Sequence, residues 1–219
     1  KEMKGLLKNH YYKLVSNLRV LLIFIFLVGI SILIFGGKNE IPLITFLCLT
    51  VIGFPFISSI GLRKNSSGKW NQYMVSLPIR RCDIIKSVFV TQFITIVIGS
   101  LLSMGVFLTS FAFHGFAFYR YVDVLLLFSF FIGVIFIMNA IFLPISYLDF
   151  NDRTEAMSII SLLTSVAIMV GLIAVINTLF EKPSDTQLIT FGIGSLLLSS
   201  ATFILSYFLT VRIYLKQDC

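Results

Sequence analysis

The stretch VLLLFSFFIGVIFIMNAIFLPISYL, residues 124–148, is 25 residues long and contains no charged side chain. A helix rises about 1.5 Å per residue and needs about 20 residues to cross the hydrocarbon core of a bilayer, so this run can span a membrane. Backbone groups in lipid must be hydrogen-bonded within the segment, and the run lacks the alternating pattern of a barrel strand. It therefore predicts a transmembrane helix.

The rest of the chain repeats this pattern, with five more charge-free runs of 18 to 26 residues. The six predicted spans are 20–37, 41–62, 88–111, 124–148, 156–180 and 186–211. Hydrophobic residues make up 58% of the chain, charged residues 12%, and the mean hydropathy is +0.98, values outside the range of soluble globular proteins. The sequence predicts an all-α polytopic membrane protein with six transmembrane helices, forming a single domain over residues 1–219.

Basic residues fall mainly on one side of the predicted membrane. If the N-terminus is cytoplasmic, six spans return the C-terminus to the cytoplasm, and 14 of the 17 Lys and Arg residues lie in cytoplasmic segments. The exceptions are Lys38, Arg120 and Lys182. Short loops with this imbalance predict an N-in/C-in topology. The net charge of +7 then reflects topology and contact with anionic membrane lipid, and no nucleic-acid partner is expected.

Residues 1–19 predict a basic amphipathic helix that lies in the membrane interface. Apolar side chains recur at helical spacing, and most of the polar and basic ones fall on the other side. The apolar positions are Met3, Leu6, Leu7, Tyr11, Leu14, Val15 and Leu18. Two roles remain open: an anchor that orients the first span, or a contact to a partner.

The predicted spans contain no Asp, Glu, Lys or Arg. Ion-coupled carriers place ionisable residues inside the bilayer, and intramembrane proteases need a catalytic carboxylate or metal motif on a span, so both classes are disfavoured. His10 and His114 fall in the interfacial helix and an outer loop and make no metal site. We expect neither a catalytic nor a metal site in this chain.

Small residues recur within the spans at the spacing of closely packed helices. Packing within the chain or against a second chain is favoured over a substrate path for any one of them. These residues are Gly99, Ser103, Ser161, Ser165, Gly192, Gly194, Ser195 and Ser199. The 23 Phe residues are interpreted mainly as lipid-facing, although a Phe-lined lateral cavity would suit an amphipathic substrate.

The stretch RKNSSGKWNQYMVSLPIRRCDIIKS, residues 63–87, is the one long polar segment of the chain and holds its only Trp. Trp70, Tyr73, Met74 and Leu77 stand at i, i+3, i+4 and i+7, which predicts a short helix with one apolar face. Pro78 ends this helix because it cannot continue the hydrogen bonding.

A basic pair, Arg80 and Arg81, follows the proline, and Asp83 then stands where a carboxylate favours the start of the third span. The aromatic side chains could lie in the headgroup region while the arginines bind anionic lipid. An aromatic face, a proline that ends the helix and a favourable start for the next helix follow one another closely here. This order favours the interpretation that the short helix docks on a cytoplasmic protein.

The order of these features resembles the permease subunits of ABC-2 type exporters. The resemblance rests on a basic amphipathic N-terminus, two spans, the pattern W-x-x-Y-x-x-x-L-P-I-x-R-x-D-I-I-x-S over residues 70–87, and four further spans. The chain is most similar to the small stand-alone permeases of Gram-positive bacteria, including those of the phenol-soluble modulin exporters. This resemblance implies a multi-pass protein of the bacterial cytoplasmic membrane.

In that family the segment between the second and third spans is a coupling helix, which sits in a groove of a cytoplasmic ATPase. The resemblance transfers this role to Trp70, Tyr73, Leu77, Pro78, Arg81 and Asp83. We add Met74, which completes the apolar face, and Arg80, which completes the basic pair. Arg80 and Cys82 depart from the family pattern of a small polar residue and a second basic one.

A second inner loop, residues 149–155, is acidic: Asp149, Asp152 and Glu155 outnumber Arg153. The resemblance implies that this loop also contacts the ATPase, and a basic partner surface would account for its charge. A solvated helix cap at Asp152 or Thr154 is an equally open alternative.

The chain contains no G-x-x-x-x-G-K-[ST] phosphate loop, so it cannot hydrolyse ATP alone. The resemblance implies a separate ABC ATPase in two copies, which binds ATP and magnesium, while this chain binds no cofactor. Six helices are few for a translocation path, so a second permease, identical or paralogous, is expected. The favoured cargo is an amphipathic peptide, and the alternative is a non-transporting scaffold or lipid-binding partner subunit.

Overall fold

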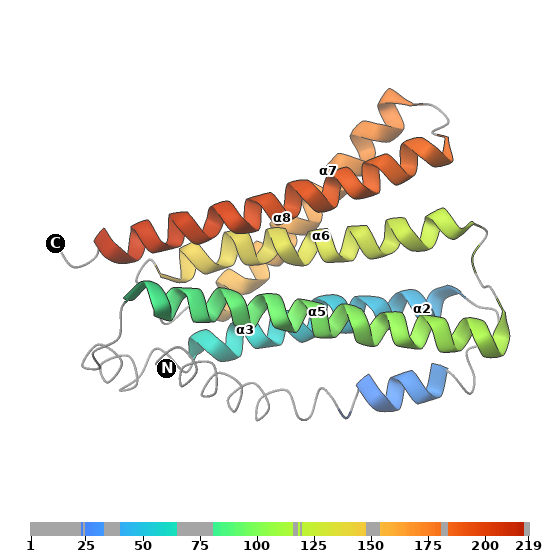
Figure 1. The fold of residues 1–219 in the computed structure, drawn as a ribbon, viewed down its shortest axis with the longest axis horizontal. Helices are drawn as coiled ribbons and strands as arrows, with labels where there is room; N and C mark the ends of the chain where they lie inside the picture. The colour runs from blue at the N-terminus through green and yellow to red at the C-terminus, as the bar shows by residue number, and fades with distance from the viewer. Residues whose placement is uncertain are drawn as a thin grey trace.

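The computed structural model describes residues 23, 25–32, 40–64, 81–115, 118, 120–147, 154–180 and 184–216. All regular elements in this part of the chain are helical (Figure 1). They are α2 (Glu40–Leu47), the π-helix η1 (Cys48–Gly53), α3 (Phe54–Lys64), α5 (Arg81–His114), α6 (Tyr121–Ser146), α7 (Thr154–Leu179) and α8 (Asp185–Lys216). Residues 25–32 form a further helical segment.

Five helices in the described ranges are long and apolar enough to cross a membrane. They cover Glu40–Gly61, Cys82–His114, Tyr121–Ser146, Glu155–Leu179 and Asp185–Tyr214, and they correspond to five of the six predicted spans. The first predicted span, 20–37, lies partly outside the described residues, although residues 25–32 within it are helical. The interfacial helix predicted over 1–19 lies wholly outside them.

Two helices extend five residues or more past the predicted limits of their spans. α5 begins at Arg81, seven residues before the predicted start at 88, and α8 continues to Lys216, five residues beyond 211. The predicted limits were set by charged residues, whereas a helix ends where its backbone hydrogen bonding ends. Asp83 is favourable in the first turn of α5, and Lys86 is tolerated because its long side chain reaches the interface.

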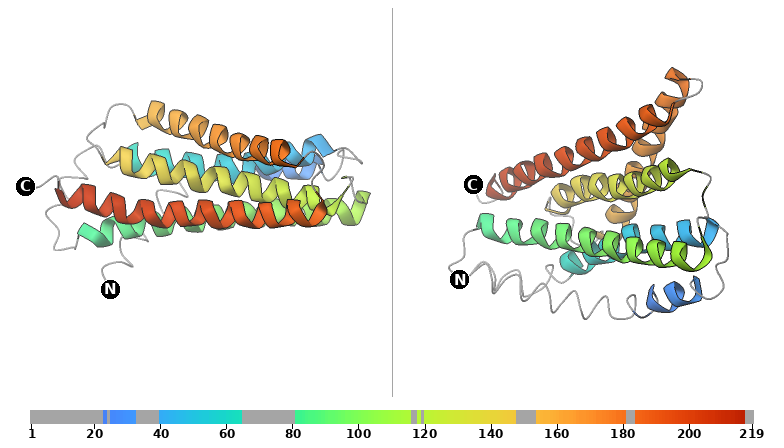
Figure 2. Two further views of the ribbon diagram at one scale, coloured as in Figure 1. Left: turned by 90° about the horizontal axis from the view of Figure 1, so that it is seen from above. Right: turned by 45° about the vertical axis from the view of Figure 1, so that its right-hand side comes forward.

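Consecutive spans run in opposite directions, so the helix ends gather at two ends of the bundle (Figures 1 and 2). α3 stops, α5 starts, α6 stops and α8 stops at one end, which we call the Lys64 end. The opposite end, where α2 and α6 begin, is called the Tyr121 end. α5 and α8 lie close together at the Lys64 end and diverge toward the Tyr121 end.

α6 is the central helix of the bundle. It packs against α7 and α8 and also contacts α2, η1, α3 and α5. Half of its most apolar window is buried, against 17% for α7, so α7 exposes most of its surface as a lipid-facing helix would. The core therefore forms around α6.

The π-helix η1 packs against α5 at a glycine. A Cβ atom built on Gly99 would lie 2.6 Å from the backbone carbonyl oxygen of Thr50, a distance that real Cβ atoms do not reach. Only glycine allows the two backbones to approach this closely. The interpretation of Gly99 as a packing residue is thereby confirmed.

The other small residues fall into two groups. Gly192 packs against α6, since a Cβ there would lie 3.2 Å from the Leu125 side chain, and Ser161, Ser165 and Ser199 are buried. These positions also agree with a packing role. Gly194 differs because nothing lies within 4 Å of a Cβ built on it.

A proline in α6 is compensated by a serine from α8. Pro144 has no N–H, so the carbonyl of Ala140, four residues earlier, loses its usual helical donor. The Ser206 hydroxyl donates a hydrogen bond to this carbonyl oxygen at 2.7 Å. Because lipid offers no alternative donor, this contact stabilises the pairing of α6 with α8.

Candidate functional site

The helices that flank the two predicted ATPase-contact segments meet at the Lys64 end (Figure 1). α3 ends at Lys64 and α5 begins at Arg81, so both helix ends lie within the first segment, 63–87. α6 ends at Ser146 and α7 begins at Thr154, on either side of the second. Both segments are therefore connected to the same end of the bundle, as a shared partner surface would require.

Most of the predicted coupling residues lie outside the described residues. These are Trp70, Tyr73, Met74, Leu77, Pro78 and Arg80 of the first segment and Asp149, Asp152 and Arg153 of the second. Arg81 is the first residue of α5, and Asp83 stands half-exposed in the first turn of that helix, as predicted. Glu155 stands exposed in the first turn of α7. Both carboxylates are at helix N-termini, where the helix dipole favours negative charge.

A buried hydrogen bond joins α3 to α6 on the Lys64 side of the bundle. The Ser59 hydroxyl lies 3.0 Å from Oδ1 of Asn139 and 2.8 Å from the carbonyl oxygen of Pro55. The Asn139 amide donates to the carbonyl oxygen of Ile135 at 3.0 Å, and both Ser59 and Asn139 are fully buried. The oxygen and the nitrogen of the Asn139 side-chain amide therefore each have a hydrogen-bond partner.

A second pair joins α3 to α5 at the same depth. Nε2 of Gln92 lies 3.5 Å from the Ser58 hydroxyl, and the Thr95 hydroxyl lies 3.4 Å from Oε1 of Gln92 and 2.8 Å from its backbone carbonyl. Gln92 is fully buried. Hydrogen bonds between membrane helices contribute only about 0.6 kcal/mol each on average, so these pairs set the relative rotation of the helices more than their stability.

The five side chains Ser58, Ser59, Gln92, Thr95 and Asn139 are named here the polar cluster. The sequence analysis did not predict the polar cluster, because it considered charged residues within the spans and did not consider side-chain amides and hydroxyls. An Asn and a Gln inside the apolar runs 88–111 and 124–148 were the available signal. Buried amides are costly in a membrane unless they are paired, so each indicates a partner helix.

The chain was compared with known proteins. A family model described as ABC-2 family transporter protein matches residues 5–215. The chain belongs to the ABC-2 transporter family. A search of the curated proteins found no match, and neither did a search of the solved structures. Membership confirms the resemblance to ABC-2 permeases, while the finer likeness to phenol-soluble modulin exporters stays a proposal.

Membrane proteins of the ABC-2 family typically partner with an ATPase subunit. In the polar cluster, two adjacent serines in the middle of α3 contact neighbouring helices: Ser58 contacts Gln92 of α5 and Ser59 contacts Asn139 of the central helix α6.

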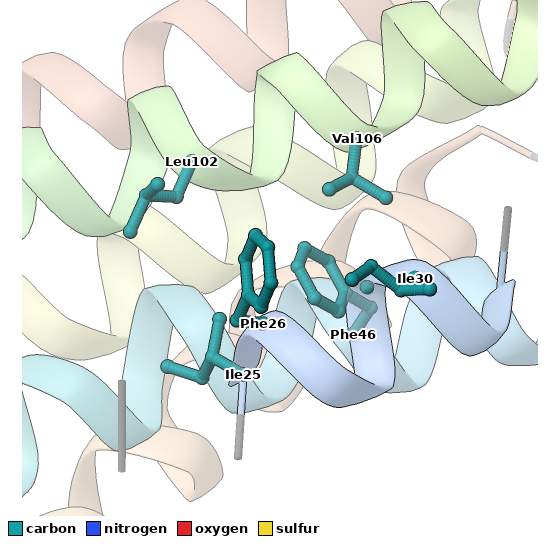
Figure 3. A pocket seen from close by; sticks show the side chains of 7 residues that line it. Ile25, Phe26, Ile30, Phe46, Leu102 and Val106 are labelled. Atoms are coloured by element: carbon teal, nitrogen blue, oxygen red, sulfur yellow. The ribbon is translucent and has the colours of Figure 1, made fainter. Parts of the chain in front are cut away.

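This ABC-2 chain has an apolar pocket elsewhere, between residues 25–32, α2 and α5 (Figure 3). Its volume is about 220 Å³, and its lining consists of Ile25, Phe26, Gly29, Ile30, Phe46, Leu102 and Val106. No polar side chain lines it. The described residues also contain no cluster of three His, Cys, Asp or Glu side chains suited to a metal ion.

Proposed function

We propose that this chain is the transmembrane permease subunit of an ATP-driven exporter in the bacterial cytoplasmic membrane. The single observation that carries the proposal is the match of the ABC-2 family model over residues 5–215, nearly the whole chain. Energy is delivered by a separate cytoplasmic ABC ATPase, which holds ATP and magnesium, because the chain has no phosphate loop of its own.

We propose that the Lys64 end is cytoplasmic and that the chain has six spans. In the described ranges, the basic residues near the Lys64 end are Arg63, Lys64, Arg81, Lys86, Arg212 and Lys216. The charged residues described near the Tyr121 end are Glu40, Arg120, Asp123 and Asp185. Of these, Arg120 pairs with Asp185 at 3.1 Å, which leaves no excess of positive charge there. The asymmetry supports an N-in/C-in topology.

The coupling route runs through residues 63–87. The face formed by Trp70, Tyr73, Met74 and Leu77 docks on the ATPase, and the carboxylates of the second segment add a contact to a basic surface. ATP binding draws two ATPase subunits together, and the two permeases rotate as rigid bodies in response. The polar cluster supports this step because it holds α3, α5 and α6 in one fixed arrangement.

The cargo class we propose is the amphipathic, membrane-active peptide, of which phenol-soluble modulins are examples. Two features support it: the similarity of the coupling motif to the small permeases of such exporters, and the lack of charged residues in the six predicted spans. A path lined by apolar groups and hydroxyls suits a peptide that already partitions into lipid.

Copurification tests the proposal that this chain binds a separate ABC ATPase. The chain, carrying an affinity tag and coexpressed with the genes that flank its own, is expected to retain an ABC ATPase in a 1:1 ratio after mild detergent extraction. An unrelated multi-pass protein with the same tag serves as the control. If the tagged chain retains no more ATPase than the control does, it acts as a scaffold or lipid-binding subunit and the exporter proposal is wrong.

A further inference from the structure

A groove between α5 and α8 opens on the side of the bundle near the Lys64 end. Its volume is about 380 Å³. It is lined by Lys86, Phe89, Val90 and Phe93 of α5 and by Phe203, Ile204 and Tyr207 of α8. On α5 the lining residues stand at i, i+3, i+4 and i+7, so the groove follows one helical stripe over about 10 Å.

Aromatic contacts fix the floor of this groove. The Phe89 ring lies 5.2 Å from the Phe203 ring and 5.4 Å from the Tyr207 ring, measured between centroids. Phe203 in turn lies 5.4 Å from Phe136 of the central helix. Phe89 and Phe203 are buried, so neither ring can turn out of the way. The groove therefore exists before anything enters it.

The outer edges of the groove are open and apolar. Phe93 is 50% exposed and Ile204 is 58% exposed, and both belong to helices that cross the membrane. In a bilayer these surfaces face acyl chains. An occupant can reach the groove sideways from the lipid without any rearrangement of the helices.

The mouth of the groove is polar and positively charged. Lys86 stands at the end nearest the start of α5, and Tyr207 lies across from it on α8. In the described part of the chain, neither the Lys86 ammonium nor the Tyr207 hydroxyl has a hydrogen-bond or ion-pair partner. A cation at the interface above an apolar channel complements an anionic head on a hydrocarbon tail.

The size of the groove decides between a lipid tail and a peptide helix. A helix is about 10 Å wide and rises about 1.5 Å per residue, so it occupies about 120 Å³ per residue. When the open space at its side is included, the groove volume is about 770 Å³. This volume would hold about six residues of a helix, which is fewer than two turns. A single acyl chain is narrow enough to follow the stripe from Lys86 to Phe93.

We infer that this groove binds an anionic phospholipid of the leaflet at the Lys64 end. One acyl chain lies along Phe89, Phe93 and Phe203, while the phosphate is held by Lys86 and accepts a hydrogen bond from Tyr207. The site goes beyond the proposed export function and does not depend on the ATPase. It makes the pairing of α5 with α8 sensitive to membrane composition.

Native mass spectrometry of the purified full chain tests this site, with phosphatidylglycerol and phosphatidylcholine as probes. We expect the wild-type chain to bind one phosphatidylglycerol more tightly than any phosphatidylcholine. Lys86→Gln is expected to weaken phosphatidylglycerol binding about fivefold. The reason is that the attraction of one Lys near a membrane surface to anionic lipid raises the affinity by about that factor. Lys86→Arg is expected to restore it.

Arg212→Gln is the matched control, since Arg212 is an exposed cation at the same end of α8 that does not line the groove. It is expected to leave the tight site unchanged. Val90→Trp fills the groove without removing charge and should abolish tight binding. Equal effects of Lys86→Gln and Arg212→Gln would overturn the inference. So would a Val90→Trp chain that still binds the lipid but no longer binds an amphipathic helical peptide.

Discussion

Replacing Trp70 and Tyr73 together with alanine is expected to abolish export while the chain still inserts into the membrane. Buried aromatic residues at protein interfaces each contribute about 2 kcal/mol or more, so losing two should weaken ATPase docking by about 1,000-fold. The spans are unchanged, so insertion should continue. Export of an amphipathic peptide from cells and the amount of membrane-inserted chain are measured side by side.

A matched variant separates docking from the general loss of aromatic rings. Phe113→Ala with Phe208→Ala removes two rings from positions that are 77% and 62% exposed on α5 and α8. These side chains face lipid, so export should stay close to the wild-type rate. Normal export by the Trp70→Ala, Tyr73→Ala variant would mean that the docking face has been assigned to the wrong residues.

Gly99→Val is expected to have the largest effect on folding. The new Cβ would lie 2.6 Å from the Thr50 carbonyl oxygen, and a backbone atom held within η1 cannot move aside as the end of a flexible side chain can. Overpacking a core commonly costs about 1–3 kcal/mol, and a clash with backbone belongs at the upper end of that range. Thermal aggregation of the detergent-solubilised chain, followed by size-exclusion chromatography, measures the loss.

Gly105→Val provides the control on the same helix. Nothing lies within 4 Å of a Cβ built on Gly105, so the substitution has the same effect on local helix propensity without a clash. We expect this variant to aggregate within a few degrees of the wild-type temperature. If the two variants lose the same stability, the contact between α5 and η1 does not depend on a glycine.

Five of the six spans were predictable because their signal is local. Runs such as 124–148 are long and free of charge, and lipid permits few alternatives to a helix. The limit of 88 for the third span was too late, since charged residues in the first turns do not end a helix and α5 begins at Arg81. The π-helix at Cys48–Gly53 also left no local signal, because its backbone shift accompanies a contact with Gly99, which is distant in sequence.

In the candidate site too, residues whose role depends on local sequence were predicted, and residues whose role depends on another helix were not. Asp83 was placed correctly in the first turn of its helix by a local rule about helix N-termini. Gln92 and Asn139 were missed because their importance depends on Ser58 and Ser59 of another helix. The docking face on Trp70 and Tyr73 remains a prediction, since those residues lie outside the described ranges.

ATP-dependent peptide uptake by membrane vesicles tests whether this chain is the permease of an exporter. Inside-out vesicles containing this chain and the ABC ATPase that copurifies with it are supplied with a fluorescent amphipathic peptide and magnesium. We expect the peptide to accumulate inside with ATP and to fail to accumulate with a non-hydrolysable analogue or with the Trp70→Ala, Tyr73→Ala chain. Equal peptide uptake with ATP and with the analogue would contradict the exporter proposal.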